Sequence, residues 1–553
     1  MGESRRNSDP RQRQYAKIPL VLRALAVLVC LLAACDALDL GFGRKGEAPQ
    51  PAESKSQTLM VGKAGDAIGL DPGRVSDDES VEICEQLYEH LVRYAPSSTE
   101  VQPELAESWE VDALGTVWTF HLRPGVSFHD GTPFDADAVV FSFDRQRNPF
   151  HPHHEPDFAY WTDQYSYIEK IEAIDRLTVK IKIERPYAPF LSSLAMFPAS
   201  IVSPAAVARY GKDFAFHPVG TGPFRFASWS PGDRIVIERN DAYWGEKARV
   251  QRIVFRDIPD ARQRLVALEG GAVDVAYSIL PEELQYVKLH PDLRLHQIAV
   301  ANVAYLAMNT SRPPFDDVEV RRAINHAVNK EPIVKLVYQG LAVPAFGPLP
   351  PSLWSYKPDI EKYAYDPVRA RAMLAARIAA GKLDPTRRYK LYVPSTPRTY
   401  LPDPELVARV IQRNLEDVGL KVDLVVQDLS SHYDALHAGK HDLCLFGWTA
   451  DNGDPDNFLK VLLDHDDNRR GPEQNDAFYR NGELHGILTY AEETFDQAER
   501  IRLYRTAQDI IARDAPWVPL AHSELVVVAR NDVEDLALHP TSTVYYRRVF
   551  LNR

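Results

Sequence analysis

Cysteine is scarce in this chain. Only four of the 553 residues are cysteine, and no two of them are spaced as Cys-x-x-Cys. A fold held together by disulfide bonds is therefore excluded. A zinc site is disfavoured because it needs closely spaced cysteine and histidine ligands. Cys84 and Cys444 are the two cysteines outside the N-terminal segment, and they lie in different patterns. Buried free thiols are favoured for both, with a disulfide between them as the alternative.

Basic residues do not predominate either. The formal net charge is −13, and the first 34 residues hold six basic residues against two acidic ones, so the rest of the chain carries −17. Nucleic-acid binding needs clustered Lys and Arg, and an acidic body repels phosphate backbones. Nucleic acid is therefore not an expected partner.

Long apolar runs are missing. The run near the N-terminus, Leu25 to Ala34, is about half of the roughly 20 residues that a spanning helix needs. A basic stretch precedes it, and it ends in Leu32-Ala33-Ala34-Cys35. This pattern indicates a lipoprotein signal peptide over residues 1–34, cleaved before Cys35 after that thiol has received a lipid. An uncleaved membrane anchor is the alternative.

The segment after Cys35 is rich in Gly, Pro, Glu and Ser and shows no hydrophobic period. We expect residues 35–57 to form a flexible tether between a lipid anchor and the folded body, which places that body outside the cytoplasm. Asp36 resembles the signal that keeps some lipoproteins in the inner membrane.

Motifs of common enzymes and metal sites are also missing. The chain contains no G-x-S-x-G elbow and no H-E-x-x-H helix, so we expect a protein that is not an enzyme and needs no cofactor. Calcium is disfavoured at Asp451, Asp454 and Asp456, because position twelve of a loop beginning at Asp451 is Leu462 and not Glu. His151, His153 and His154 lie in the run HPHHEP, whose prolines argue against a helix that would present them together, so a solvated loop is favoured over a metal site.

What is present is a long globular chain. Its 553 residues exceed the roughly 300 at which one hydrophobic core stops growing, so two or more domains are expected. The composition, with 45% hydrophobic and 25% charged residues, is typical of a globular protein. Short apolar strands alternate with amphipathic helices, so the class is α/β. Trp118, Phe120 and Leu122 alternate with polar residues as in a strand, and Asp135 can cap the helix that follows. Pro332 predicts the start of a later helix.

Four blocks, in this order along the chain, make the sequence similar to a known family. They are Leu105 to Pro149 (LAESWEVDALGTVWTFHLRPGVSFHDGTPFDADAVVFSFDRQRNP), Pro218 to Phe226 (PVGTGPFRF), Val320 to Lys330 (VRRAINHAVNK) and Phe446 to Phe458 (FGWTADNGDPDNF). The chain resembles the extracellular solute-binding proteins of bacterial peptide importers from about Leu59 to near its C-terminus.

The resemblance implies a two-lobed periplasmic binding protein fold, type II, with an extra subdomain and a hinge that lets the lobes close as a clamshell. Lobe I would comprise residues 58–297 and 521–553, with the extra subdomain at about 103–218. Lobe II would comprise residues 298–520.

The resemblance also implies the ligand site. Asp451 would hold the amine of a peptide and Arg398 its carboxylate, because a buried zwitterion needs an opposite charge at each end. Trp448, Thr449 and Ala450 would run beside the peptide backbone as an added strand does. The family's cysteine pair soon after the counterpart of Phe458 is absent here.

By resemblance, the function would be capture of short peptides, dipeptides in particular, and their delivery to the permease and ATPase of an ABC importer. The protein would act as a periplasmic, membrane-anchored monomer. Another cargo on the same scaffold, such as a longer or antimicrobial peptide, haem or a chelated metal, is the alternative.

Overall fold

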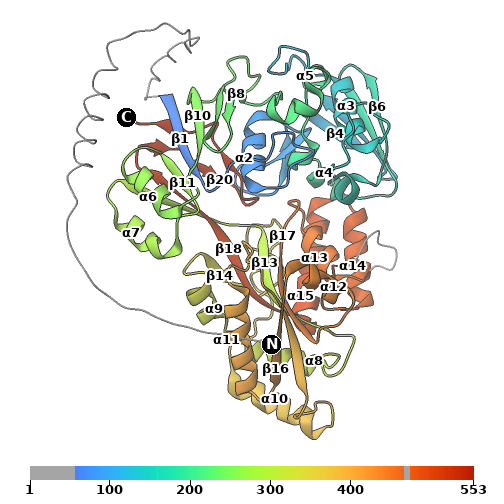
Figure 1. The fold of residues 1–553 in the computed structure, drawn as a ribbon. Helices are drawn as coiled ribbons and strands as arrows, with labels where there is room; N and C mark the ends of the chain where they lie inside the picture. The colour runs from blue at the N-terminus through green and yellow to red at the C-terminus, as the bar shows by residue number, and fades with distance from the viewer. Residues whose placement is uncertain (1–56, 159, 466–473) are drawn as a thin grey trace, which may run out of the picture. The chain divides into compact units, whose positions relative to one another are not determined.

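The computed structural model describes residues 57–158, 160–465 and 474–553 (Figure 1). The predicted signal peptide, Cys35 and nearly all of the predicted tether lie outside these residues. Strands and helices alternate along the described chain, as the α/β prediction requires. We keep the names lobe I (58–297 and 521–553) and lobe II (298–520) for the predicted parts, whose limits stay predictions.

The elements of the first part of the chain are β1 (Thr58–Lys63), α2 (Asp78–Leu87), β2 (Val92–Tyr94), β3 (Val101–Pro103), β4 (Ala106–Val111), β5 (Val117–Leu122), α3 (Ala136–Arg147), η2 (Trp161–Tyr165), β6 (Ile168–Asp175), β7 (Thr178–Ile183), α4 (Phe190–Ser193), η3 (Phe197–Ala199), α5 (Pro204–Tyr210), η4 (Gly211–Phe216), β8 (Phe224–Ser230), β9 (Arg234–Arg239), β10 (Arg252–Asp257), α6 (Ala261–Glu269), β11 (Val275–Tyr277), η5 (Pro281–Glu283), α7 (Leu284–Leu289) and β12 (Leu293–Ala299). The later elements are β13 (Asn302–Met308), α8 (Val318–Ala327), α9 (Lys330–Val337), β14 (Ala342–Pro344), α10 (Pro367–Ala379), β15 (Arg388–Pro394), α11 (Pro404–Asp417), β16 (Lys421–Gln427), α12 (Leu429–His437), β17 (Leu443–Thr449), α13 (Asp456–Leu463), α14 (Gly482–Glu493), α15 (Gln497–Asp514), β18 (Trp517–Arg530), β19 (Val533–Glu534), β20 (Ala537–Leu538), β21 (Val544–Tyr545) and β22 (Phe550–Leu551).

Aspartate begins many of these helices. Its carboxylate accepts a hydrogen bond from a backbone N–H of the first turn, which has no partner inside the helix. The predicted cap Asp135 does this for α3, where it accepts from the N–H of Ala138 at 3.2 Å. The other aspartate caps are Asp77, Asp260, Asp317, Asp366, Asp403, Asp428 and Asp496.

The two larger sheets of lobe I are built from distinct sets of strands. β1 lies between β10 and β11 and runs parallel to both, and β9 and β8 continue the sheet in antiparallel fashion. A separate antiparallel sheet in the order β4-β5-β7-β6 falls within the predicted extra subdomain. In β5, Trp118, Phe120 and Leu122 are buried in the core of that sheet, as their alternation predicts.

Lobe II is built on the order β16-β15-β17-β13, with β15 parallel to β16 and β17 and with β13 antiparallel to β17. Two buried apolar clusters cover its faces. One includes Val320 and Ile324 of α8, and the other includes Phe458 and Leu462 of α13.

Strand β18 belongs to both lobes. Its first half pairs with β13 and β14, and its second half pairs with β11 and β12. Val518 and Leu520 are accordingly buried in a lobe II cluster, whereas Val527 is buried in a lobe I cluster. In Figure 1 this strand, in red, runs from one half of the molecule into the other.

Candidate functional site

The segment predicted to lie beside the peptide backbone, Trp448 to Ala450, is at the outer end of β17. This strand pairs with β13 along its whole length, from Leu443 opposite Met308 to Thr449 opposite Asn302. Its residues are buried up to Gly447, whereas Trp448 is half-buried and Thr449 is exposed. Ala450 continues the pairing by donating its N–H to the carbonyl of Ala301 at 2.8 Å. The strand therefore leaves the core at the residues predicted to lie beside a ligand.

Asn457 fixes the predicted amine-binding residue. Its Oδ1 accepts hydrogen bonds from the Nε1–H of Trp448 and from the backbone N–H of Asp451, both at 2.9 Å. Its Nδ2 lies 3.3 Å from Oδ2 of Asp451. Because Asn457 is itself buried, the Asp451 carboxylate and the Trp448 indole are held in one arrangement. Sequence reasoning missed Asn457, although it stands inside the quoted block.

The neighbouring carboxylates have a partner within the protein. Arg500 of α15 donates from both terminal nitrogens to the two oxygens of Asp454, at 2.7 and 2.8 Å. Asp456 donates its backbone N–H to Oδ1 of Asp454 at 3.0 Å. Among the residues that the structure describes, no group of three or more His, Cys, Asp or Glu side chains could hold a metal ion. The Asp454 carboxylate therefore anchors the loop that carries Asp451.

Arg398 lies in the segment after β15, where its backbone exchanges two hydrogen bonds with Leu401, at 3.0 and 2.8 Å. The residue is exposed. Partial burial acts to lower the pKa of Arg398, but hydrogen bonds with Tyr400 and Tyr433 outweigh it and raise the pKa above its usual value. A permanent positive charge is therefore presented at this surface.

Tyr433 of α12 connects the two predicted charges. Burial raises the pKa of its phenol, the positive charge of Arg398 acts to lower it, and the negative charges of Asp476 and Asp451 raise it further. The charges of Arg398 and Asp451, which lie 53 positions apart in the sequence, thus act in opposite directions on the pKa of one phenol.

Lobe I also contacts this loop. Gln164 of η2 places its Nε2 at 3.5 Å from Oδ2 of Asp451. Tyr187, which follows β7, donates its hydroxyl to Oδ2 of Asp456 at 3.4 Å. Tyr94 of β2 accepts a hydrogen bond from the backbone N–H of Gly453 at 2.9 Å. The loop of the predicted amine site therefore lies at the boundary between the two lobes.

Comparison with known proteins bears on this geometry. Residues 100–469 match the family model described as bacterial extracellular solute-binding proteins, family 5. The chain belongs to this family.

Its relatives carry names of different cargoes. The chain is 34% identical to heme-binding protein A of Haemophilus influenzae, over 90% of this chain and 93% of that protein. It is also 34% identical to the dipeptide-binding protein of Escherichia coli, over 90% of this chain and 95% of that protein. The solved structure of the ABC transporter-associated periplasmic binding protein DppA from Helicobacter pylori, in complex with peptide STSA, is similar with a TM-score of 0.70 and 32% identity, covering 90% of this chain and 98% of that one.

This family member has the α/β, two-lobed fold of periplasmic binding proteins. Cys84 and Cys444 are both buried free thiols, as favoured from the sequence. Within the described residues, none of the helices combines the length and the apolar character needed to cross a membrane.

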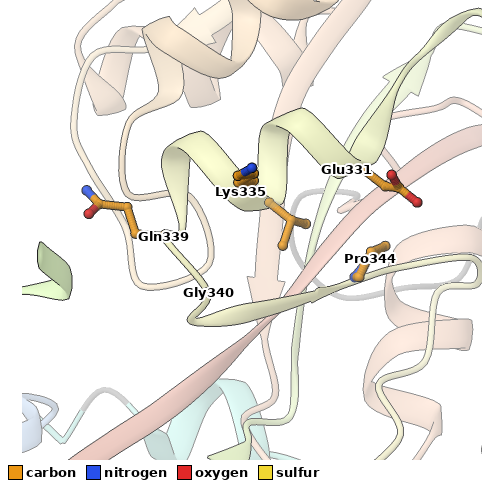
Figure 2. A pocket seen from close by; sticks show the side chains of 6 residues that line it. Glu331, Lys335, Gln339, Gly340 and Pro344 are labelled. Carbon is orange, nitrogen blue, oxygen red and sulfur yellow. The ribbon is translucent and has the colours of Figure 1, made fainter. Parts of the chain in front are cut away.

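A surface pocket of about 530 Å³ lies elsewhere, between α9 and β14 (Figure 2). Its lining residues are Glu331, Val334, Lys335, Gln339, Gly340 and Pro344. None of the predicted ligand residues lines it, and the side chains of Glu331, Lys335 and Gln339 point in different directions in Figure 2. We therefore do not assign the ligand site to this pocket.

Proposed function

We propose that this protein captures short peptides, dipeptides in particular, and delivers them to the permease and ATPase of an ABC importer. The observation that carries the proposal is the Asp451 carboxylate, which Asn457 holds just beyond the exposed end of β17, together with the exposed cation of Arg398 in the segment after β15.

The chemistry suits a zwitterion. The ammonium of a peptide requires an anion when it leaves water, and Asp451 supplies one that Asn457 holds in place. The carboxylate requires a cation, and the planar fork of Arg398 donates two parallel hydrogen bonds to such a group. The backbone groups of Trp448, Thr449 and Ala450 pair with the peptide backbone between its ends. The protein therefore selects little among ligand side chains.

Capture requires both lobes. Asp451 and Arg398 belong to lobe II, whereas Gln164 approaches Asp451 from lobe I. We infer that the lobes close over the ligand about the strands that join them, so that bound peptide is removed from solvent. The protein works as a periplasmic monomer held to the inner membrane by a lipid on Cys35.

Haem is the second candidate cargo, because one relative is named heme-binding protein A. Haem has no ammonium group for Asp451, whereas its propionate carboxylates can still pair with Arg398. The two proposals therefore differ in their dependence on Asp451.

A thermodynamic cycle tests the peptide proposal. Loss of one partner of a buried charge pair costs about 2 to 5 kcal/mol, which is roughly thirty-fold to several-thousand-fold in affinity. We expect Asp451→Asn to weaken binding of L-alanyl-L-phenylalanine by this amount. The same variant should weaken binding of the N-acetylated dipeptide far less, because the shared interaction is already gone. Likewise, Arg398→Gln should weaken binding of the free dipeptide strongly and binding of the C-terminally amidated dipeptide far less.

Isothermal titration calorimetry of each protein with each ligand gives the coupling directly. Asp359→Asn is the control, because this lobe II carboxylate is 79% exposed and should leave the affinity unchanged. If the loss of affinity from Asp451→Asn and the loss from N-acetylation simply add, Asp451 does not contact the amine. Tight binding of haemin that Asp451→Asn does not alter would favour the second candidate.

A further inference from the structure

The loop after Asp451 makes an unusually close contact with lobe I. The backbone N–H of Gly453 donates to the hydroxyl of Tyr94 at 2.9 Å, and that hydroxyl donates in turn to the carbonyl of Ser192 at 2.8 Å. Tyr94 is only 7% exposed. The hydrogen bond therefore joins a lobe II peptide group to a buried phenol that lobe I holds in place.

Only glycine allows this approach. A Cβ atom at position 453 would lie 2.4 Å from Cβ of Thr99 and 2.8 Å from Cε1 of Tyr94. Thr99 is 1% exposed and cannot swing aside into solvent. No real Cβ contact is that short, so any other residue at position 453 keeps the two surfaces apart.

Further contacts flank the glycine along the same boundary. Ala188 donates its backbone N–H to the carbonyl of Glu492 at 2.6 Å, and Arg185 lies 3.2 Å from the Glu492 carboxylate. These contacts join the segment before α4 to the end of α14, and Figure 1 shows these two helices near each other at the boundary. None of them involves a group predicted to bind the ligand.

We propose that Gly453, Tyr94 and Thr99 form a latch that holds the two lobes closed and thereby sets the affinity for every ligand by the same factor. The proposal rests on the proposed function, in which ligand is captured between the lobes. For a protein that binds ligand only when closed, the apparent dissociation constant equals the intrinsic dissociation constant divided by the fraction of closed molecules. The three latch residues are therefore positioning residues that act on affinity without contacting the ligand.

The first test is Tyr94→Phe. It leaves the Gly453 N–H without an acceptor, so we expect about five- to thirty-fold weaker binding of both L-alanyl-L-phenylalanine and its N-acetylated form. The factor should be the same for both ligands, because none of the three latch residues contacts the amine. Tyr165→Phe is the matched control. Tyr165 is also buried in lobe I and donates to the adjacent carbonyl, that of Ser193, at 2.8 Å.

The second test is Gly453→Ala, which inserts the missing Cβ. We expect about thirty-fold weaker binding or more, and a larger radius of gyration by small-angle scattering at saturating dipeptide. Thr99→Gly in the same chain removes the closest clashing atom and should restore part of the affinity. Gly486→Ala is the control, since a Cβ at that lobe II position meets nothing within 4 Å.

The outcomes separate the latch from the peptide proposal. Gly453→Ala and Tyr94→Phe proteins that bind dipeptide as wild type does, with the same radius of gyration, overturn the latch and leave peptide binding intact. A wild-type protein that binds no dipeptide overturns the peptide proposal instead. In that case the latch is tested by the radius of gyration of the unliganded proteins. The latch proposal is overturned unless the Gly453→Ala protein has a larger radius of gyration than both the wild type and the Gly486→Ala protein.

Discussion

Replacement of Arg500 by Met should destabilise lobe II strongly. Arg500 is 5% exposed and Asp454 is 3% exposed, and two hydrogen bonds of 2.7 and 2.8 Å join them. Arg500 also donates to the hydroxyl of Tyr504 at 2.7 Å and to the carbonyl of Ala491 at 3.0 Å. Arg500→Met keeps most of the apolar stem but removes every one of these donors, and it leaves the Asp454 carboxylate buried without its cation.

The magnitude follows from that geometry. Removing one partner of a buried ion pair costs about 3 to 5 kcal/mol. Unfolding entropy is about 2.1 cal/mol/K per residue, so for a lobe of roughly 220 residues that unfolds as its own unit the midpoint should fall by about 6 to 11 °C. Asp456 adds to the cost, because burial and the charges of Glu492 and Asp454 already raise the pKa of its carboxyl group, and Arg500 opposes this rise.

Differential scanning calorimetry measures the shift. Arg409→Met is the matched control, because Arg409 of α11 forms an ion pair with Glu405 in which both side chains are about half exposed, and such pairs contribute about 0 to 1 kcal/mol. The double variant Asp454→Leu/Arg500→Met removes both charges and should cost less than the two single changes together. A shift for Arg500→Met no larger than that for Arg409→Met, or strict additivity in the double variant, would refute the reasoning.

Three further predictions are independent of this pair. Cys35→Ser should abolish lipidation and release the protein from the membrane, and mass spectrometry of the mature N-terminus checks this: an unmodified Cys35 in the wild type, or retention of the segment before it, would contradict the signal-peptide prediction. Saturating dipeptide should reduce the radius of gyration measured by small-angle scattering, and no compaction would count against lobe closure. Burial raises the pKa of Asp476 from 3.8 to about 7, although a hydrogen bond from Tyr305 opposes the rise. The folded state therefore binds more protons than the unfolded state between these two pH values, so the contribution of Asp476 to stability falls as the pH rises from about 4 to 7. Asp476→Asn should remove this decline when unfolding midpoints at pH 5 and pH 8 are compared, and an unchanged slope would be the contrary result.

Local signals predicted local structure well. The alternation of Trp118, Phe120 and Leu122 gave a correct strand because one face of β5 packs on a core. The Asp135 cap was correct because its carboxylate satisfies a backbone donor only three residues away, that of Ala138. The helix assigned to Pro332 begins earlier, at Lys330, and ends at Val337. Proline is tolerated throughout the first helical turn, so it locates a helix start only to within a few residues.

Contacts between distant segments were not predictable in this way. Asp451 and Arg398 were identified through the family resemblance, and no pattern in the sequence shows that both charges act on the pKa of Tyr433. The close approach of Gly453 to Tyr94 joins residues 359 positions apart. A glycine in a loop rich in Asp and Asn indicates a turn, and only the structure shows that its missing side chain is what admits lobe I.

The placement of β18 has a consequence for the order in which the protein can fold. A chain made N-terminus first exposes β1, β11 and β13 long before Trp517–Arg530 is available to pair with the strands of both lobes. Until then each sheet presents an unpaired edge, and neither core can be sealed. Completion of both lobes therefore waits until nearly the whole polypeptide is available, which concentrates the aggregation hazard of the chain in the interval before β18 can pair.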